Sequence, residues 1–120
     1  MKFCWVTLMV RDLEESLKFY NEIVGLDVRG RFEAGPVVEI AFLGDGDTKV
    51  ELICNKGIKE LSPGRDVSLG FEVDSLDRMM EIVKEKGIDI ESGPIQPNPQ
   101  TKFFFVLDPN GYRIQFVENR

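Results

Sequence analysis

The chain has 120 residues, of which 42% are hydrophobic and 10% aromatic, enough apolar material to form the core of one domain. It carries 21 acidic against 15 basic residues, a formal charge of −6, so nucleic acid and anionic membranes are not expected as partners. The sequence contains no histidine, which removes the commonest metal ligand and general base. Any catalysis is therefore expected to use carboxylates, thiols, lysine, tyrosine or a bound ligand.

The amino-terminal apolar run meets charge at Arg11 and Asp12, so it is too short to span a membrane, and it lacks a small-residue cleavage site. We expect a soluble cytoplasmic protein. Cys4 and Cys54 lie in apolar, strand-like runs without CxxC spacing, which favours two small buried hydrophobic residues. A reactive thiol is the alternative.

The first half of the chain has the pattern of a strand, a helix and three further strands. Residues 3–10 alternate as a strand does, and Asp12 is suited to cap a helix that Gly25 ends. Clusters of Gly, Pro and Asp then separate three expected strands, at 26–33, 37–43 and 48–54. The order is βαβββ.

The second half repeats this order after a connector at 55–65. The expected elements are a strand at 67–73, a helix at 75–86 that Gly87 ends, and strands near 88–92, 102–107 and 112–118. Three of the six prolines fall within 93–99, which predicts a loop there and makes this segment the best candidate for a mobile lid.

The two halves also resemble each other in sequence. The strand–helix segments 8–24 and 71–87 are 63 positions apart, and the turn–strand segments 43–53 and 107–117 are offset by 64. Such self-similarity indicates two copies of one unit, about 1–55 and 66–120, with a ligand site where the copies face each other.

Three motifs carry a resemblance to a known family. The segment Leu8–Tyr20, the triplet Val24-Gly25-Leu26 and the segment Asp108–Ile114 resemble the vicinal oxygen chelate superfamily, the glyoxalase, bleomycin-resistance and extradiol-dioxygenase group. The resemblance implies an α+β fold in which two tandem βαβββ units form an open, cupped mixed sheet within a single glyoxalase-like domain, residues 1–120. It also implies a homodimer in which two chains complete each other's cup.

Strand periodicity predicts which side chains line such a cup. If alternate residues pack on the helices, the remaining positions of the first and last strands of each unit face the cup; the candidate ligand-binding residues among them are Trp5, Thr7, Glu51, Ser68, Glu72, Arg113 and Gln115. The repeat offsets pair Trp5 with Ser68 and Glu51 with Gln115.

The resemblance implies that four of these positions correspond to the metal ligands of metal-dependent relatives, typically His or Gln, Glu, His and Glu. Here they are Trp5, Glu51, Ser68 and Gln115. Tryptophan cannot bind a metal ion, serine is a poor neutral ligand, and one carboxylate with one amide does not offset the dehydration of a divalent cation. We therefore expect no metal and no cofactor.

Several residues keep more than one interpretation. Glu51 is a candidate catalytic base, a hydrogen-bond acceptor for a ligand, or the ion-pair partner of Lys49 or Arg113. Glu72 either shares the cup with it or is a solvated strand end. Trp5 either stacks on a planar ligand or fills a core or a dimer interface. The aromatic residues of 102–105 suit a strand covered on both sides, and a plain core strand is the simpler interpretation.

The sequence thus favours metal-independent binding of a small organic molecule, in the manner of the drug-sequestering members of the family. The alternative is a metal-dependent lyase or isomerase of the glyoxalase I (lactoylglutathione lyase) kind. A third class is an interaction module whose cup closes on a partner chain.

Overall fold

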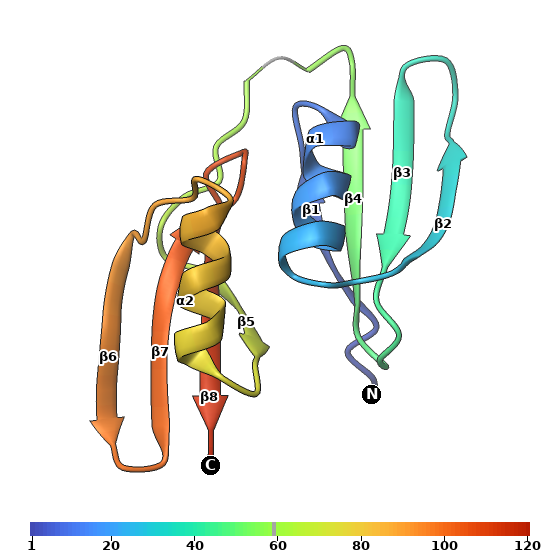
Figure 1. Cartoon of the computed structure of the whole chain (residues 1–120). Helices are drawn as coiled ribbons and strands as arrows, with labels where there is room; N and C mark the ends of the chain where they lie inside the picture. The colour runs from blue at the N-terminus through green and yellow to red at the C-terminus, as the bar shows by residue number, and fades with distance from the viewer. Residues whose placement is uncertain (59) are drawn as a thin grey trace. The chain divides into compact units, whose positions relative to one another are not determined.

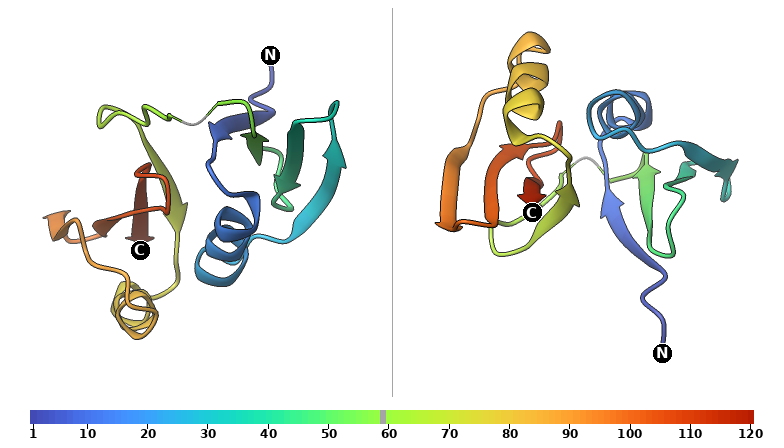
Figure 2. Two further views of the ribbon diagram at one scale, coloured as in Figure 1. Left: turned by 90° about the horizontal axis from the view of Figure 1, so that it is seen from above. Right: turned by 60° about the horizontal axis from the view of Figure 1, so that its bottom comes forward.

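The computed structural model describes residues 1–58 and 60–120, which form two compact units, Met1–Ser62 and Pro63–Arg120. Each unit consists of a four-stranded mixed sheet with helical segments on one face (Figure 1). The left view of Figure 2 shows these helical segments end-on, each beside the sheet of its own unit. The predicted α+β class and the two tandem βαβββ units are confirmed. That the two units form one domain with a shared cup stays a prediction.

The first unit contains, in chain order, β1 (Trp5–Met9), α1 (Leu13–Lys18), the π-helix η1 (Phe19–Ile23), β2 (Val28–Glu33), β3 (Val38–Leu43) and β4 (Lys49–Asn55). The strands lie in the order β1-β4-β3-β2. β1 pairs with β4 in parallel, while the other pairs are antiparallel. The elements agree with the expected ones to within a few residues at their ends.

The first helix begins and ends where the sequence predicts. Asp12 is extended, and its carboxylate accepts a hydrogen bond of 3.1 Å from the backbone N–H of Glu15. Gly25, at φ 86°, follows the helical segment. In its second half the helix widens, and the N–H of Val24 donates to the carbonyl of Phe19 at 3.2 Å, a bond spanning five residues. The hydrophobic spacing gave no sign of this widening.

The second unit contains β5 (Ser68–Glu72), α2 (Leu76–Glu85), β6 (Ser92–Asn98), β7 (Thr101–Leu107) and β8 (Arg113–Asn119). The strands lie in the order β5-β8-β7-β6, with β5 and β8 parallel. This is the order of the first unit, so the sequence repeat corresponds to a structural repeat.

The start of α2 is held by two different side chains. The Ser75 hydroxyl accepts from the N–H of Arg78 at 3.2 Å, and the buried carboxylate of Glu118 accepts from the N–H of Leu76 at 2.8 Å. Arg120 donates to the other oxygen of Glu118 at 2.6 Å. The Leu76 hydrogen bond first, and then that of Arg120, hold the pKa of Glu118 below its usual range. Strand β8 is thereby attached to the helix that covers it.

The prediction for residues 88–99 is wrong. The strand is not at 88–92, and the expected proline-rich loop is instead β6, an edge strand paired antiparallel with β7 (Figure 1). The register shifts on both sides of Ile95. An edge strand tolerates Pro94 and Pro97 because one of its sides needs no N–H donor and its irregularities absorb the missing ones. A segment paired into the sheet is not a lid.

The alternation expected along the strands is confirmed by burial. In each unit the core lies between the sheet and its helices, and most positions expected to face the helices are buried, among them Leu8, Val10, Val50, Leu52, Ile114 and Phe116. Four of these positions, Val6, Leu69, Phe71 and Val73, are only half-buried. In the run 102–105, Phe104 belongs to the core, with its ring 5.5 Å from that of Phe116, whereas Phe103 and Phe105 lie partly exposed on the other face.

Only one of the two cysteines behaves as expected. Cys54 is buried in β4, whereas Cys4 is exposed, because it precedes the first residue of β1 and lies beyond the packed part of the sheet. In the part of the chain that the structure describes, no helix is long and apolar enough to cross a membrane.

Candidate ligand-binding site

Glu51 projects from the sheet face that the helices leave uncovered, and its carboxylate is held by a neighbour. Thr7 lies opposite Glu51 in the parallel pair of β1 and β4, and its hydroxyl donates to Oε1 of Glu51 at 2.5 Å. Among the described residues of its own unit, Glu51 forms no ion pair, and Lys49 donates instead to the carbonyl of Gly46. Arg113 belongs to the second unit, where it pairs with Glu91, and its pairing with Glu51 stays a prediction. Within the first unit, a neutral hydroxyl thus restrains the carboxylate.

Three aromatic residues extend across the same face from Glu51. We call Trp5, Phe42 and Phe32 the aromatic row. The rings of Trp5 and Phe42 meet edge-on, with centroids 5.4 Å apart, and Phe42 stacks on Phe32 at 6.3 Å. Phe42 lies directly opposite Glu51 in the antiparallel pair of β3 and β4. Trp5 is 47% and Phe32 is 49% exposed. A planar apolar group of a ligand could contact the exposed rings of Trp5 and Phe32, close to the Glu51 carboxylate.

Phe32 and Phe42 could not be recognised as site residues from the sequence pattern. Their place within each strand followed from the period-two pattern, but their approach to Trp5 depends on the pairing of β2, β3 and β4. That register also contains an irregularity between Val28 and Gly30. Neighbouring strands cannot be aligned from alternation alone.

The remaining predicted residues lie on the uncovered face of the second sheet. Ser68 lies opposite Arg113, and Gly70 opposite Gln115, in the parallel pair of β5 and β8. The Gln115 amide oxygen is 3.1 Å from where a Cβ on Gly70 would be, so glycine at this position leaves room for the amide. Glu72 accepts a hydrogen bond of 2.9 Å from the Asn119 amide and is therefore tied to β8.

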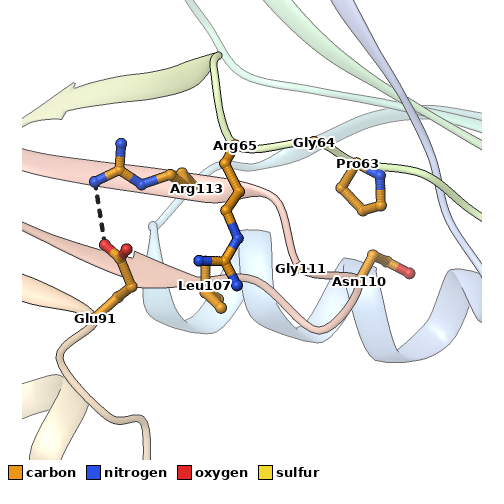
Figure 3. A pocket seen from close by; sticks show the side chains of 8 residues that line it. All are labelled: Pro63, Gly64, Arg65, Glu91, Leu107, Asn110, Gly111 and Arg113. Carbon is orange, nitrogen blue, oxygen red and sulfur yellow. Dashed lines mark hydrogen bonds and ion pairs between the residues drawn. The ribbon is translucent and has the colours of Figure 1, made fainter.

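Arg113 lines a pocket of about 310 Å³ in the second unit (Figure 3). Its guanidinium lies 4.0 Å from the centre of the Phe105 ring, and its Nη2 is 3.1 Å from Oε2 of Glu91. Residues from the connector, the end of β7 and the turn before β8 complete the lining; they are Pro63, Gly64, Arg65, Leu107, Asn110 and Gly111. Strand periodicity had indicated Arg113, but neither Glu91 nor Arg65.

The turn beside this pocket has a structural role. The carboxylate of Asp108 accepts from the N–H groups of Asn110 at 2.8 Å and Tyr112 at 2.9 Å. Gly111 follows at φ 98°. The turn therefore fixes the start of β8 and, with it, the backbone of Arg113.

The structure thus brings Trp5, Thr7 and Glu51 together on one sheet, and Ser68, Glu72, Arg113 and Gln115 on the other. The pairing of Trp5 with Ser68 and of Glu51 with Gln115 stays a prediction.

The donor chemistry at the four positions implied for a metal does not fit a divalent cation. Indole nitrogen only donates a hydrogen bond, and the hydroxyl of Ser68 and the amide of Gln115 are neutral. Glu51 is the single carboxylate of this set, and one of its oxygens already accepts from Thr7. A Mg²⁺-, Zn²⁺- or Ni²⁺-type site needs more charge or imidazole than these residues offer.

Comparison with known proteins gives a consistent match over nearly the whole chain. Residues 2–116 match the family model described as Glyoxalase/Bleomycin resistance protein/Dioxygenase superfamily. The chain is 33% identical over 129 residues to "Lactoylglutathione lyase" of Haemophilus influenzae, which covers 100% of this chain and 94% of that protein. The protein of the same name from Neisseria meningitidis serogroup A is 31% identical over 134 residues, covering 100% and 92%.

Solved structures share the fold. The trypanothione-dependent glyoxalase I of Leishmania major superposes with a TM-score of 0.85 at 22% identity, covering 98% of this chain and 86% of that one. TnmS3, an antibiotic binding protein from Streptomyces sp. CB03234, superposes with a TM-score of 0.78 at 21% identity, covering 100% and 97%.

Proposed function

The chain belongs to the Glyoxalase/Bleomycin resistance protein/Dioxygenase superfamily, and on that basis we propose that it binds a small organic molecule on the uncovered faces of its sheets without a metal ion. The observation that carries the proposal is the Glu51 carboxylate, held by Thr7 beside the aromatic row. The ligand-contacting residues would be Trp5, Thr7, Glu51, Ser68, Glu72, Arg113 and Gln115.

The arrangement suits one kind of ligand. The rings of Trp5 and Phe32 are exposed, so a planar apolar group can pack against them. Aromatic side chains have few rotatable bonds and lose little conformational entropy when a ligand binds. Glu51 accepts hydrogen bonds from a hydroxyl, amine or amide on the same molecule. Because the Thr7 bond restrains the carboxylate, little freedom remains to be lost on binding.

We also propose a homodimer in the cytoplasm. Trp5 and Phe32 form part of an exposed apolar surface, and symmetric pairing is the commonest way of covering such a surface. The free thiols of Cys4 and Cys54 suit a reducing compartment.

A metal-dependent lyase is the second candidate, and the names of the relatives favour it. Proteins called lactoylglutathione lyase match this chain over its full length at 31 to 33% identity. Glu51 would then be the catalytic carboxylate. Against this candidate stand Trp5, Ser68 and Gln115, whose side chains supply neither imidazole nor a second carboxylate.

The single tryptophan of the chain makes the proposal directly testable, because Trp5 fluorescence reports on the proposed site alone. Purified protein would be screened against metal ions and metabolites by fluorescence and thermal shift. A ligand at 100 times its Kd adds about 2.7 kcal/mol to stability. We expect an organic compound, and no divalent metal, to change both signals.

The Thr7→Val variant then tests the role of Glu51. Loss of the restraining hydrogen bond should raise the Kd of the compound about three- to tenfold, since ordering one freed side chain on binding costs about 0.5–1.5 kcal/mol. Thr48→Val is the matched control, because the Thr48 hydroxyl donates to the carbonyl of Phe3 at 2.8 Å, away from Glu51. Equal Kd values in the two variants would contradict the proposal.

A further inference from the structure

We propose that the pocket at the start of β8 binds the oxyanion group, carboxylate or phosphate, of a small molecule through Arg65 and Arg113. Two guanidinium groups and one carboxylate, that of Glu91, line this pocket of about 310 Å³. Their sum is +1 on a chain whose formal charge is −6. The pocket is thus positively charged on a chain that is negative overall. Clefts lined by positive charge concentrate anions.

Arg113 is held so that its hydrogen-bonding capacity is only partly used. Phe105 supports the guanidinium at 4.0 Å, and Glu91 contacts Nη2 at 3.1 Å. Among the residues that the structure describes, Nε of Arg113 is the buried side-chain nitrogen or oxygen that lacks a hydrogen-bond partner. Glu91 therefore does not form the bidentate ion pair that a guanidinium can make with a carboxylate. A second acceptor would satisfy donors that Glu91 leaves unused.

Arg65 reaches the same pocket from the connector. Figure 3 shows its side chain extending from the backbone beside Gly64 toward Leu107, with Arg113 and Glu91 lining the same space. Pro63 contributes to the position of this backbone, because its Cγ is 3.6 Å from where a Cβ on Gly111 would be. Within the described part of the chain, Arg65 is exposed and no carboxylate forms an ion pair with it.

An oxyanion is the occupant that this lining favours. A cation would face two guanidinium groups, and an apolar group would remove water from charges without replacing their hydrogen bonds. Carboxylate and phosphate oxygens match the planar fork of arginine and tolerate one nearby Glu when two arginines are present.

The inference goes beyond the proposed function and does not depend on the aromatic row. All pocket residues lie in the second unit, between Pro63 and Arg113, whereas Trp5, Phe32 and Phe42 lie in the first. Arg113 is the one residue shared with the proposed ligand contacts.

The test is a titration followed by NMR of the arginine Nε–Hε signals, using inorganic phosphate in one arm and succinate in the other, at constant ionic strength. We expect saturable shifts for Arg65 and Arg113 in at least one arm. Saturation with phosphate alone, or with succinate alone, identifies which oxyanion fits.

Three variants of the full chain make the test specific. Arg65→Gln should raise the Kd about tenfold, as loss of a charge-assisted contact predicts. Arg78→Gln, which removes an equal charge from the exposed surface of α2, should leave the Kd unchanged. Glu91→Gln should lower the Kd several-fold, because it removes the competing carboxylate from Arg113.

The absence of saturable shifts in both arms would overturn the inference, as would equal Kd values for the Arg65 and Arg78 variants. A Trp5 fluorescence response to an organic compound would be unaffected by either result, so failure of the oxyanion pocket is distinguishable from failure of the proposed function.

Discussion

The hydroxyl of Thr7 and the carboxylate of Glu51 are 2.5 Å apart on adjacent parallel strands. Their register on β1 and β4 places the acceptor beside Trp5 and Phe42 on the face that the helices leave uncovered. Of the interpretations that the sequence allowed for Glu51, the ion pair with Lys49 is thereby replaced by a hydrogen bond to a neutral group, whereas an ion pair with Arg113 of the second unit stays a prediction.

Two aromatic substitutions should separate the site from the core. Phe32→Ala removes a ring that is 49% exposed, so its effect on the free energy of unfolding should stay below about 1 kcal/mol. Phe104→Ala removes a ring with 0% exposure and should cost about 3–5 kcal/mol. Chemical denaturation measures both. A Phe32 variant as unstable as the Phe104 variant would show that the aromatic row is core.

Acid should weaken the capping of α2 by Glu118. The pKa of Glu118 is lowered in the folded protein, chiefly by the N–H of Leu76. Its contribution to stability is therefore fully present above the unfolded-state pKa, near 4.5, and is lost as the pH falls through the lower folded-state pKa.

The Glu118→Gln variant tests this pH dependence. Its deficit in unfolding free energy relative to the parent should be constant between pH 6 and 8 and should shrink on acidification below about pH 5. Glu85→Gln, at the exposed end of α2, is the control and should show no such trend. A Glu118 deficit independent of pH down to pH 3 would contradict the assignment.

Most of the fold could be predicted from the sequence, because hydrophobic periodicity and the residues that begin and end helices depend only on neighbouring residues. Asp12 as a cap, Gly25 and Gly87 as helix ends, and the buried alternation of β4 all followed from residue type and spacing.

The failures have non-local causes. Pro94 and Pro97 indicated a loop, yet they lie in β6, where the edge position removes the need for their missing N–H groups. The contacts of Phe32 with Phe42, and of Glu91 with Arg113, depend on strand register and loop course. Alternation fixes which face a residue occupies and leaves its cross-strand neighbour undetermined.

Restoring the implied ligand set should create a metal site. The variant Trp5→His, Ser68→His and Gln115→Glu would join Glu51 in a set of two imidazoles and two carboxylates, which suits Zn²⁺ or Ni²⁺. We expect it to bind one such ion per chain by isothermal titration calorimetry while the parent binds none. No gain in binding would show that these four positions do not surround one site.

Assembly can be tested by sedimentation. Exposed Trp5 and Phe32 favour a symmetric homodimer, so analytical ultracentrifugation at micromolar concentration should give twice the chain mass of 13.7 kDa. The Phe32→Asp variant should shift the equilibrium toward monomer. A parent protein that sediments as a monomer would contradict this expectation.

The most direct test of the account is a glyoxalase I assay on the unmodified protein. That reaction needs a cation to stabilise the oxygen charge that develops as a proton moves between adjacent carbons. Trp5 offers such a cation no ligand, and Ser68 offers only a poor, neutral one. Turnover of a methylglyoxal–thiol adduct would be measured with added Zn²⁺, Ni²⁺ or Mn²⁺ and with chelator. We predict no turnover above the uncatalysed rate in any condition, whereas turnover that falls on adding chelator would show that a metal site exists and that metal-independent binding is wrong.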